Sequence, residues 1–90
     1  MRIISQNKEH DIPYEHCALW TKYQENIIYA TPIGEQDTLL QMARYSTQEK
    51  AEKAMKMFHR YYGNYMIEKI YKQELCNVWP VFQFPQEEEL

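Results

Sequence analysis

The sequence predicts a small α+β domain in which an N-terminal antiparallel sheet of about four strands is packed by one long C-terminal helix. Three observations carry this prediction. Segments within residues 16–45 alternate apolar and polar side chains, which is the period of a strand. Residues 46–65 carry apolar side chains at three- and four-residue spacing, which is the period of a helix. Residues 77–85 are extended again, and Pro80 and Pro85 confine them to a sheet edge or to an arm laid on a neighbour.

The four expected strands occupy residues 2–6, 16–23, 27–31 and 38–45. Pro32 ends the third strand and places that end at a sheet edge or a bulge. In the fourth strand, alternation puts Leu40 and Met42 on one face and Leu39, Ala43 and Tyr45 on the other. One helix covers only one face of a sheet, so the apolar groups on the second face are expected to meet a second helix or another subunit.

The expected helix begins after Ser46 or Thr47, either of which can serve as N-cap. Glu49 follows Ser46 at the spacing of a capping box. Gly63 suits the left-handed position that ends a helix. Residues 64–75 regain a helical pattern, so a second short helix or a kinked extension is expected there.

The composition fits one globular domain over residues 1–85, followed by a solvated acidic tail over residues 86–90. The net charge of −3 comes from the tail, because removing Glu87, Glu88 and Glu89 leaves ten acidic against ten basic residues. A neutral body is not expected to bind duplex nucleic acid. No run of transmembrane length and no apolar signal region are present, so no membrane association is expected. Cys17 and Cys76 are expected to be free thiols.

The residues that could perform catalysis or bind a metal do not form a known motif. His10, Asp11, Glu15 and His16 have no compact metal-ligand spacing. Cys17 follows His16 directly, and neighbouring residues of a strand point to opposite faces. Two glycines are too few for a phosphate-cradling loop. We therefore expect no catalytic residue, no metal, no cofactor and no enzymatic activity.

Binding is the remaining class of function. A small nucleotide needs a planar surface for stacking and a fork of donors for phosphate, and arginine beside aromatic residues supplies both. The helix N-terminus can add backbone donors for an anion. The competing interpretation is that these aromatic residues belong to the core or to a subunit interface. The candidate ligand-binding residues are Arg44, Thr47, Arg60, Tyr61 and Phe82.

Four stretches together resemble small proteins encoded by phages and prophages of Gram-positive gut bacteria: residues 1–6, 11–15, 45–55 and 81–86. Within that group the chain looks similar to anti-Thoeris proteins of the signal-sequestering type. Those proteins are sponges: they are oligomers that bind cyclic ADP-ribose isomers, and in some members cyclic oligonucleotides, without cleaving them. The chain is shorter than such relatives between Tyr62 and Val78.

The resemblance implies a non-catalytic homo-oligomer that sequesters a small-molecule nucleotide signal in the cytoplasm of an infected bacterial host. Two other functions stay open at this point. One is a protein-binding inhibitor of a host defence protein, such as an anti-CRISPR. The other is a structural component of a phage.

Overall fold

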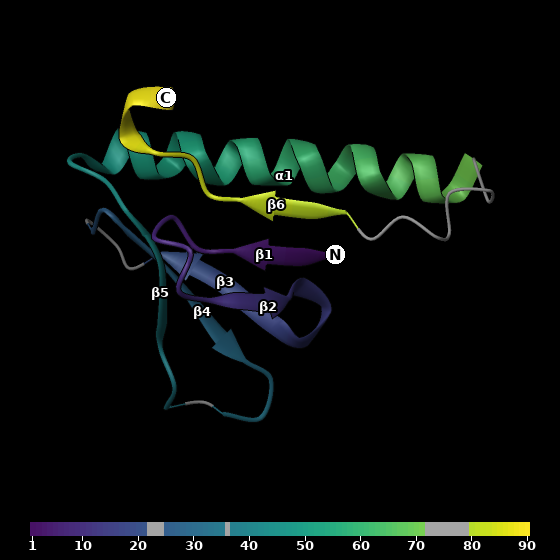
Figure 1. Ribbon diagram of the computed structural model, residues 1–90, viewed down its shortest axis with the longest axis horizontal. Coiled ribbons are helices and arrows are strands. Elements are labelled where there is room, and N and C mark those ends of the chain that lie inside the picture. Colours follow the sequence, from purple (N-terminus) through teal and green to yellow (C-terminus); the bar gives the residue numbers. More distant parts are fainter. Residues whose placement is uncertain (22–24, 36, 72–79) are drawn as a thin grey trace.

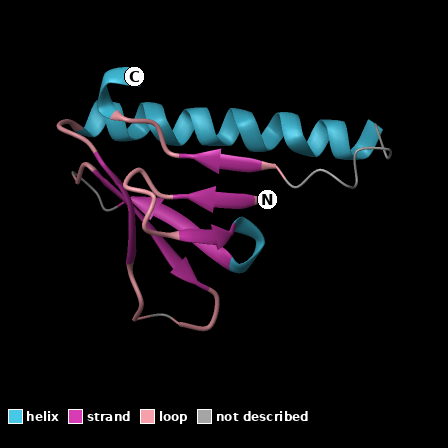
Figure 2. Ribbon diagram, viewed as in Figure 1, coloured by secondary structure: helices cyan, strands magenta, loops and turns pink. Residues whose placement is uncertain are grey.

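The computed structural model of the chain is a small α+β fold of two three-stranded sheets and one long helix (Figures 1 and 2). The structure describes residues 1–21, 25–35, 37–71 and 80–90. The strand order is β2-β1-β6 in the first sheet and β3-β4-β5 in the second. The elements are β1 (Arg2–Ile4), β2 (Asp11–Pro13), a 3-10 turn (Tyr14–His16), β3 (Cys17–Thr21), β4 (Ile27–Pro32), β5 (Leu40–Arg44), α1 (Gln48–Tyr71), β6 (Val81–Gln83) and a second 3-10 turn (Glu87–Glu89).

The division into two sheets differs from the single antiparallel sheet that was predicted. β1 pairs antiparallel with β2 and parallel with β6, so that Ile3 lies opposite both Ile12 and Phe82. Among the described strands β6 pairs with β1 alone, so it is an edge strand, as its flanking prolines predict. The parallel pairing joins the two ends of the chain, and local alternation in the sequence carries no information about such a distant partner.

Helix α1 begins where the sequence predicts, but it does not end there. The Thr47 hydroxyl accepts a hydrogen bond from the Lys50 amide at 3.2 Å, which makes Thr47 the N-cap. The predicted stop at Gly63 is wrong, because α1 continues through it to Tyr71 and absorbs the start of the predicted second helix. The rest of that prediction, residues 72–75, lies outside the described residues. The apolar stripe of α1 continues past Gly63 with Tyr65, so packing offsets the low helix propensity of glycine.

The core lies where α1 meets both sheets. Phe58 is fully buried and packs edge-on against Tyr14 and Phe82, with ring centroids at 4.9 Å and 5.3 Å. Nearer the start of α1, the small buried side chains of Ala51 and Ala54 let the helix approach β4. The buried hydrophobic residues are Met1, Ile3, Cys17, Ile28, Ala30, Met42, Ala43, Tyr45, Ala51, Ala54, Phe58, Phe82 and Phe84. Among the described residues, no helix has the length and apolar character needed to cross a membrane.

The acidic segment 86–90, predicted as a solvated tail, lies against the start of α1. The Glu87 carboxylate accepts a hydrogen bond from the Ser46 amide and lies 3.7 Å from the Lys50 ammonium. Leu90 packs against the core. Just before the segment, the buried Tyr45 hydroxyl donates to the Pro85 carbonyl at 2.8 Å. The C-terminal residues therefore hold the junction between β5 and α1.

Candidate functional site

The face of the β3-β4-β5 sheet that is turned away from the core carries a stacked pair of aromatic rings. Trp20 on β3 lies opposite Tyr29 on β4, and their rings are 5.0 Å apart at an angle of 29°. The indole nitrogen of Trp20 donates to the Thr31 hydroxyl at 2.9 Å, which fixes the orientation of the ring. Both aromatic side chains are half-buried. We call this surface the outer face, and its members are Ala18, Trp20, Ile27, Tyr29, Thr31, Gln41 and Arg44.

A β-bulge brings Arg44 onto the outer face. Ile28 pairs with Ala43 while Tyr29 pairs with Gln41, so Met42 is an extra residue between them. Met42 and Ala43 are consequently both buried, although strict alternation predicts opposite faces for them. After the bulge, Arg44 is exposed and shares the face of Tyr29.

The electrostatics of the outer face link Tyr29 to two charged side chains. The Tyr29 hydroxyl donates to the Glu25 carboxylate at 3.1 Å. Desolvation and then this hydrogen bond to Glu25 raise the pKa of Tyr29, while the Arg44 charge acts on that pKa in the opposite direction. Arg44 is therefore within electrostatic range of the aromatic pair. The outer face combines a planar surface with a guanidinium and a carboxylate.

The predicted ligand-binding residues separate into two groups. Arg44 and Thr47 lie at the junction of β5 and α1, whereas Arg60 and Tyr61 lie in the middle of α1. Arg60 lies thirteen positions after Thr47, a distance of about 20 Å along the helix axis. One mononucleotide cannot span the two groups within a single chain.

The start of α1, predicted to bind an anion through backbone donors, already faces a carboxylate of the same chain. Thr47 caps the helix with its own hydroxyl. The Glu87 carboxylate accepts a hydrogen bond from the Ser46 amide. Hydrogen bonding to the Ser46 side chain and then to its backbone lowers the pKa of the Glu87 carboxyl group, with a smaller contribution from Lys50. The anion at this helix end is therefore supplied internally.

The second group consists of Arg60 and Tyr61 on α1 together with Phe82 on β6. The ring centroids of Tyr61 and Phe82 are 5.5 Å apart, so the structure brings these two predicted residues together. Phe82 is buried in the core, whereas Tyr61 is 39% exposed. Arg60 is exposed on the same helix. In this group, Tyr61 and Arg60 are the side chains that a ligand can reach.

Trp20 and Tyr29 were not among the site residues predicted from the sequence. Both stand at alternating positions of predicted strands, and a large aromatic side chain on the polar side of a strand is a usable signal. Their pairing depends on the register of β3 against β4, which that signal does not provide. The position of Arg44 beside them depends on the bulge.

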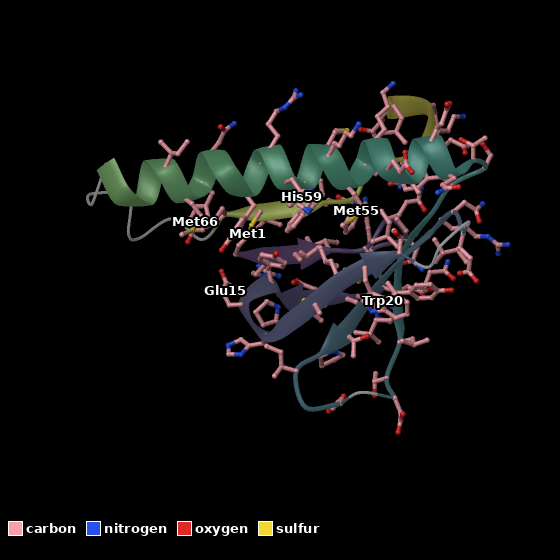
Figure 3. All side chains as sticks on the ribbon, turned by 180° about the vertical axis from the view of Figure 1, so that it is seen from behind. Met1, Glu15, Trp20, Met55, His59 and Met66 are labelled. Carbon is pink, nitrogen blue, oxygen red and sulfur yellow. The ribbon has the colours of Figure 1, made fainter. Side chains whose placement is uncertain are left out.

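The other candidates for chemistry have structural roles. The Cys17 thiol is buried, which raises its pKa, and it contacts the Tyr14 carbonyl oxygen at 3.6 Å. Asp11 forms an ion pair with Arg2. The Glu15 carboxylate lies 2.8 Å from the amino group of Met1, and these two residues are labelled in Figure 3. Within the described ranges, no three His, Cys, Asp or Glu side chains gather as they would around a metal.

Comparison of the chain with protein-family models, with curated proteins and with solved structures finds no match in any of the three.

Proposed function

We propose that the chain is a non-catalytic, phage-encoded anti-defence protein that binds and sequesters a cyclic nucleotide immune signal. The signal is a cyclic ADP-ribose isomer or a cyclic oligonucleotide. The observation that carries the proposal is the stacked Trp20–Tyr29 pair with Arg44 on the same face. The resemblance to signal-sequestering phage proteins supports it independently.

Each group of the outer face has a counterpart in a nucleotide. A base stacks on an aromatic ring whatever its sequence identity, and such stacking contributes about 1–3 kcal/mol per base. The Arg44 guanidinium offers parallel donors to two phosphate oxygens. The Glu25 carboxylate, already an acceptor for Tyr29, has further lone pairs for a ribose hydroxyl or a base amine.

Sequestration without cleavage agrees with the chemistry of these groups. The proposed contacts are stacking, an ion pair and hydrogen bonds, all of which form and break reversibly. The Cys17 thiol is held in its protonated form by burial, so it is a poor nucleophile. The protein then acts by lowering the free concentration of its ligand.

Thermal unfolding with a panel of cyclic ADP-ribose isomers, cyclic di-AMP and cyclic di-GMP tests the proposal. A ligand that binds only the folded state raises the melting temperature by mass action, and the expected result is a shift with at least one member. The bound compound is then released by denaturation and identified by mass spectrometry, which should recover it unchanged. Recovery of a cleaved product would contradict sequestration.

Two arginine variants locate the site. Arg44→Ala removes charge-assisted hydrogen bonds and should weaken ligand binding by about tenfold or more in calorimetry. Arg60→Ala removes the same side chain from an exposed position in the middle of α1, about 20 Å along the helix axis from Thr47, and should leave the dissociation constant within about twofold. Equal losses in both variants, or none in either, would place the ligand elsewhere.

A second candidate function has one observation in its favour. The connection between β4 and β5 exposes two large apolar residues, Ile33 at 72% and Leu39 at 46%. Exposed apolar groups beside a sheet are typical of a protein-binding surface. If no nucleotide of the panel shifts the melting temperature, inhibition of a host defence protein becomes the better proposal.

A further inference from the structure

Strand β3 has one edge that is not paired with any described strand. The Ile33 amide donates to the His16 carbonyl at 2.9 Å, which makes these two residues a hydrogen-bonded pair of the antiparallel ladder. Such pairs alternate, so Ala18 and Trp20 direct their backbone groups toward β4. Pro32 lies opposite Cys17 in a non-hydrogen-bonded pair, so its lack of an N–H costs the β3–β4 ladder no hydrogen bond. The backbone groups of Leu19 and Thr21 therefore point to the free edge.

The two edges of the β3-β4-β5 sheet differ in how they are protected. Gln6 covers the outer edge of β5. Its backbone N–H donates to the Met42 carbonyl at 2.7 Å, and its side-chain oxygen accepts from the Arg44 backbone N–H at 3.0 Å. Proteins protect exposed edges with charged residues, prolines or bulges. β3 has the sequence CALWT and pairs with β4 without a register shift, so it has none of these devices.

The free edge is complementary to a second copy of itself. A two-fold axis through Leu19 would pair each Leu19 with the partner's Leu19 and each Thr21 with the partner's Cys17. The Cys17 amide already donates to the Tyr14 carbonyl of its own chain, so Cys17 would contribute only its carbonyl oxygen, as acceptor for the partner's Thr21 amide. On the outer face, the large Trp20 would lie opposite the partner's Ala18, the smallest side chain of the strand. The strand is uncharged, so no like charges meet across the axis.

From these observations we infer that the chain forms a symmetric dimer in which β3 pairs antiparallel with β3 of a second copy. The result is one continuous six-stranded sheet with an isologous interface. The two Trp20–Tyr29 pairs then lie on one shared outer face. Seen from behind, β3 and Trp20 lie below the side of α1 that carries Met55 and His59 (Figure 3). This inference goes beyond the proposed function and does not depend on it.

Sedimentation equilibrium of the full chain tests the dimer. The wild type should be dimeric at micromolar concentration. Ala18→Glu places a carboxylate against the partner's Trp20 and should raise the dimer dissociation constant on the order of tenfold or more. Gln41→Glu adds the same charge to the outer face on β5, two strands away, and should leave the constant unchanged. A monomeric wild type, or equal effects of the two variants, would overturn the inference.

Amide hydrogen exchange of the wild type gives a second test that needs no variant. Leu19 and Thr21 have outward amides, which exchange quickly in a monomer. In the dimer these two amides should be protected as strongly as those of Ala18 and Trp20, and protection should fall on dilution. Fast exchange at Leu19 and Thr21 in a dimeric sample would show that another surface joins the copies, and would overturn the inference.

Discussion

Gln6 connects three parts of the molecule through one side chain. Its side-chain nitrogen donates to the Pro85 carbonyl at 3.3 Å, and its side-chain oxygen accepts from the Arg44 backbone N–H at 3.0 Å. Its own carbonyl accepts from the Gln86 side chain at 2.7 Å. The end of β1, the edge of β5 and the C-terminal segment are therefore tied at a single residue.

Replacing Gln6 tests this role. Gln6→Ala removes two side-chain hydrogen bonds, each contributing about 1 kcal/mol, so we expect the free energy of unfolding to fall by about 2 kcal/mol in urea denaturation. Gln48→Ala removes one hydrogen bond, to Glu52, from an exposed glutamine on α1 and is the matched control, with an expected loss of no more than about 1 kcal/mol. Equal losses would show that Gln6 has no special connecting role.

Among the elements, α1 shows most directly what the sequence pattern can and cannot predict. Its start is set by Thr47, whose capping is a local interaction and was predicted. The end of α1 was not predicted, because Gly63 has no side chain and is compatible with both a helix end and a helix interior. The choice depends on whether Tyr62 and Tyr65 find packing partners, which the tertiary structure decides.

Gly63→Ala distinguishes the two conformations by the sign of its effect. A Cβ at Gly63 would meet nothing within 4 Å, and its φ is not in the left-handed region. Alanine should therefore increase the free energy of unfolding by about 1 kcal/mol, which chemical denaturation can measure. A decrease of similar size would show that Gly63 ends the helix in a left-handed conformation.

Contact between the C-terminal turn and α1 should depend on pH through Glu87. Its hydrogen bond from Ser46 lowers the pKa of the folded state below the unfolded value. The stabilisation is therefore complete above the unfolded pKa and is lost as pH falls through the lower, folded pKa. Denaturation at several acidic pH values should show a shallower loss of stability in Glu87→Gln than in the wild type. Parallel curves for the two proteins would contradict this contribution.

For the whole molecule, composition and local periodicity predicted the α+β class, the helix start and the edge position of β6. They did not predict the division into two sheets, because the partner of β1 is more than 70 residues away in the chain. They selected Arg44 but not Trp20 and Tyr29, since that surface depends on the β3–β4 register and on the bulge at Met42. Both features arise from pairing between strands.

The proposed dimer and the proposed ligand site both depend on the assembled β3-β4-β5 sheet. The half-buried aromatic residues on the outer face agree with the expectation that this face has a partner. If β3 joins two copies, the same face presents two aromatic pairs and two arginines to one ligand or to two.

The central claim, that a cyclic nucleotide binds against Trp20, is tested most directly by tryptophan fluorescence. The chain has two tryptophans, Trp20 and Trp79, so a Trp79→Phe variant leaves Trp20 as the reporter. Titration with a panel member that binds in calorimetry should change Trp20 emission saturably, with the same dissociation constant. Arg44→Ala should shift this change to ligand concentrations about tenfold higher or more. A ligand that binds by calorimetry while Trp20 emission stays constant would contradict the claim.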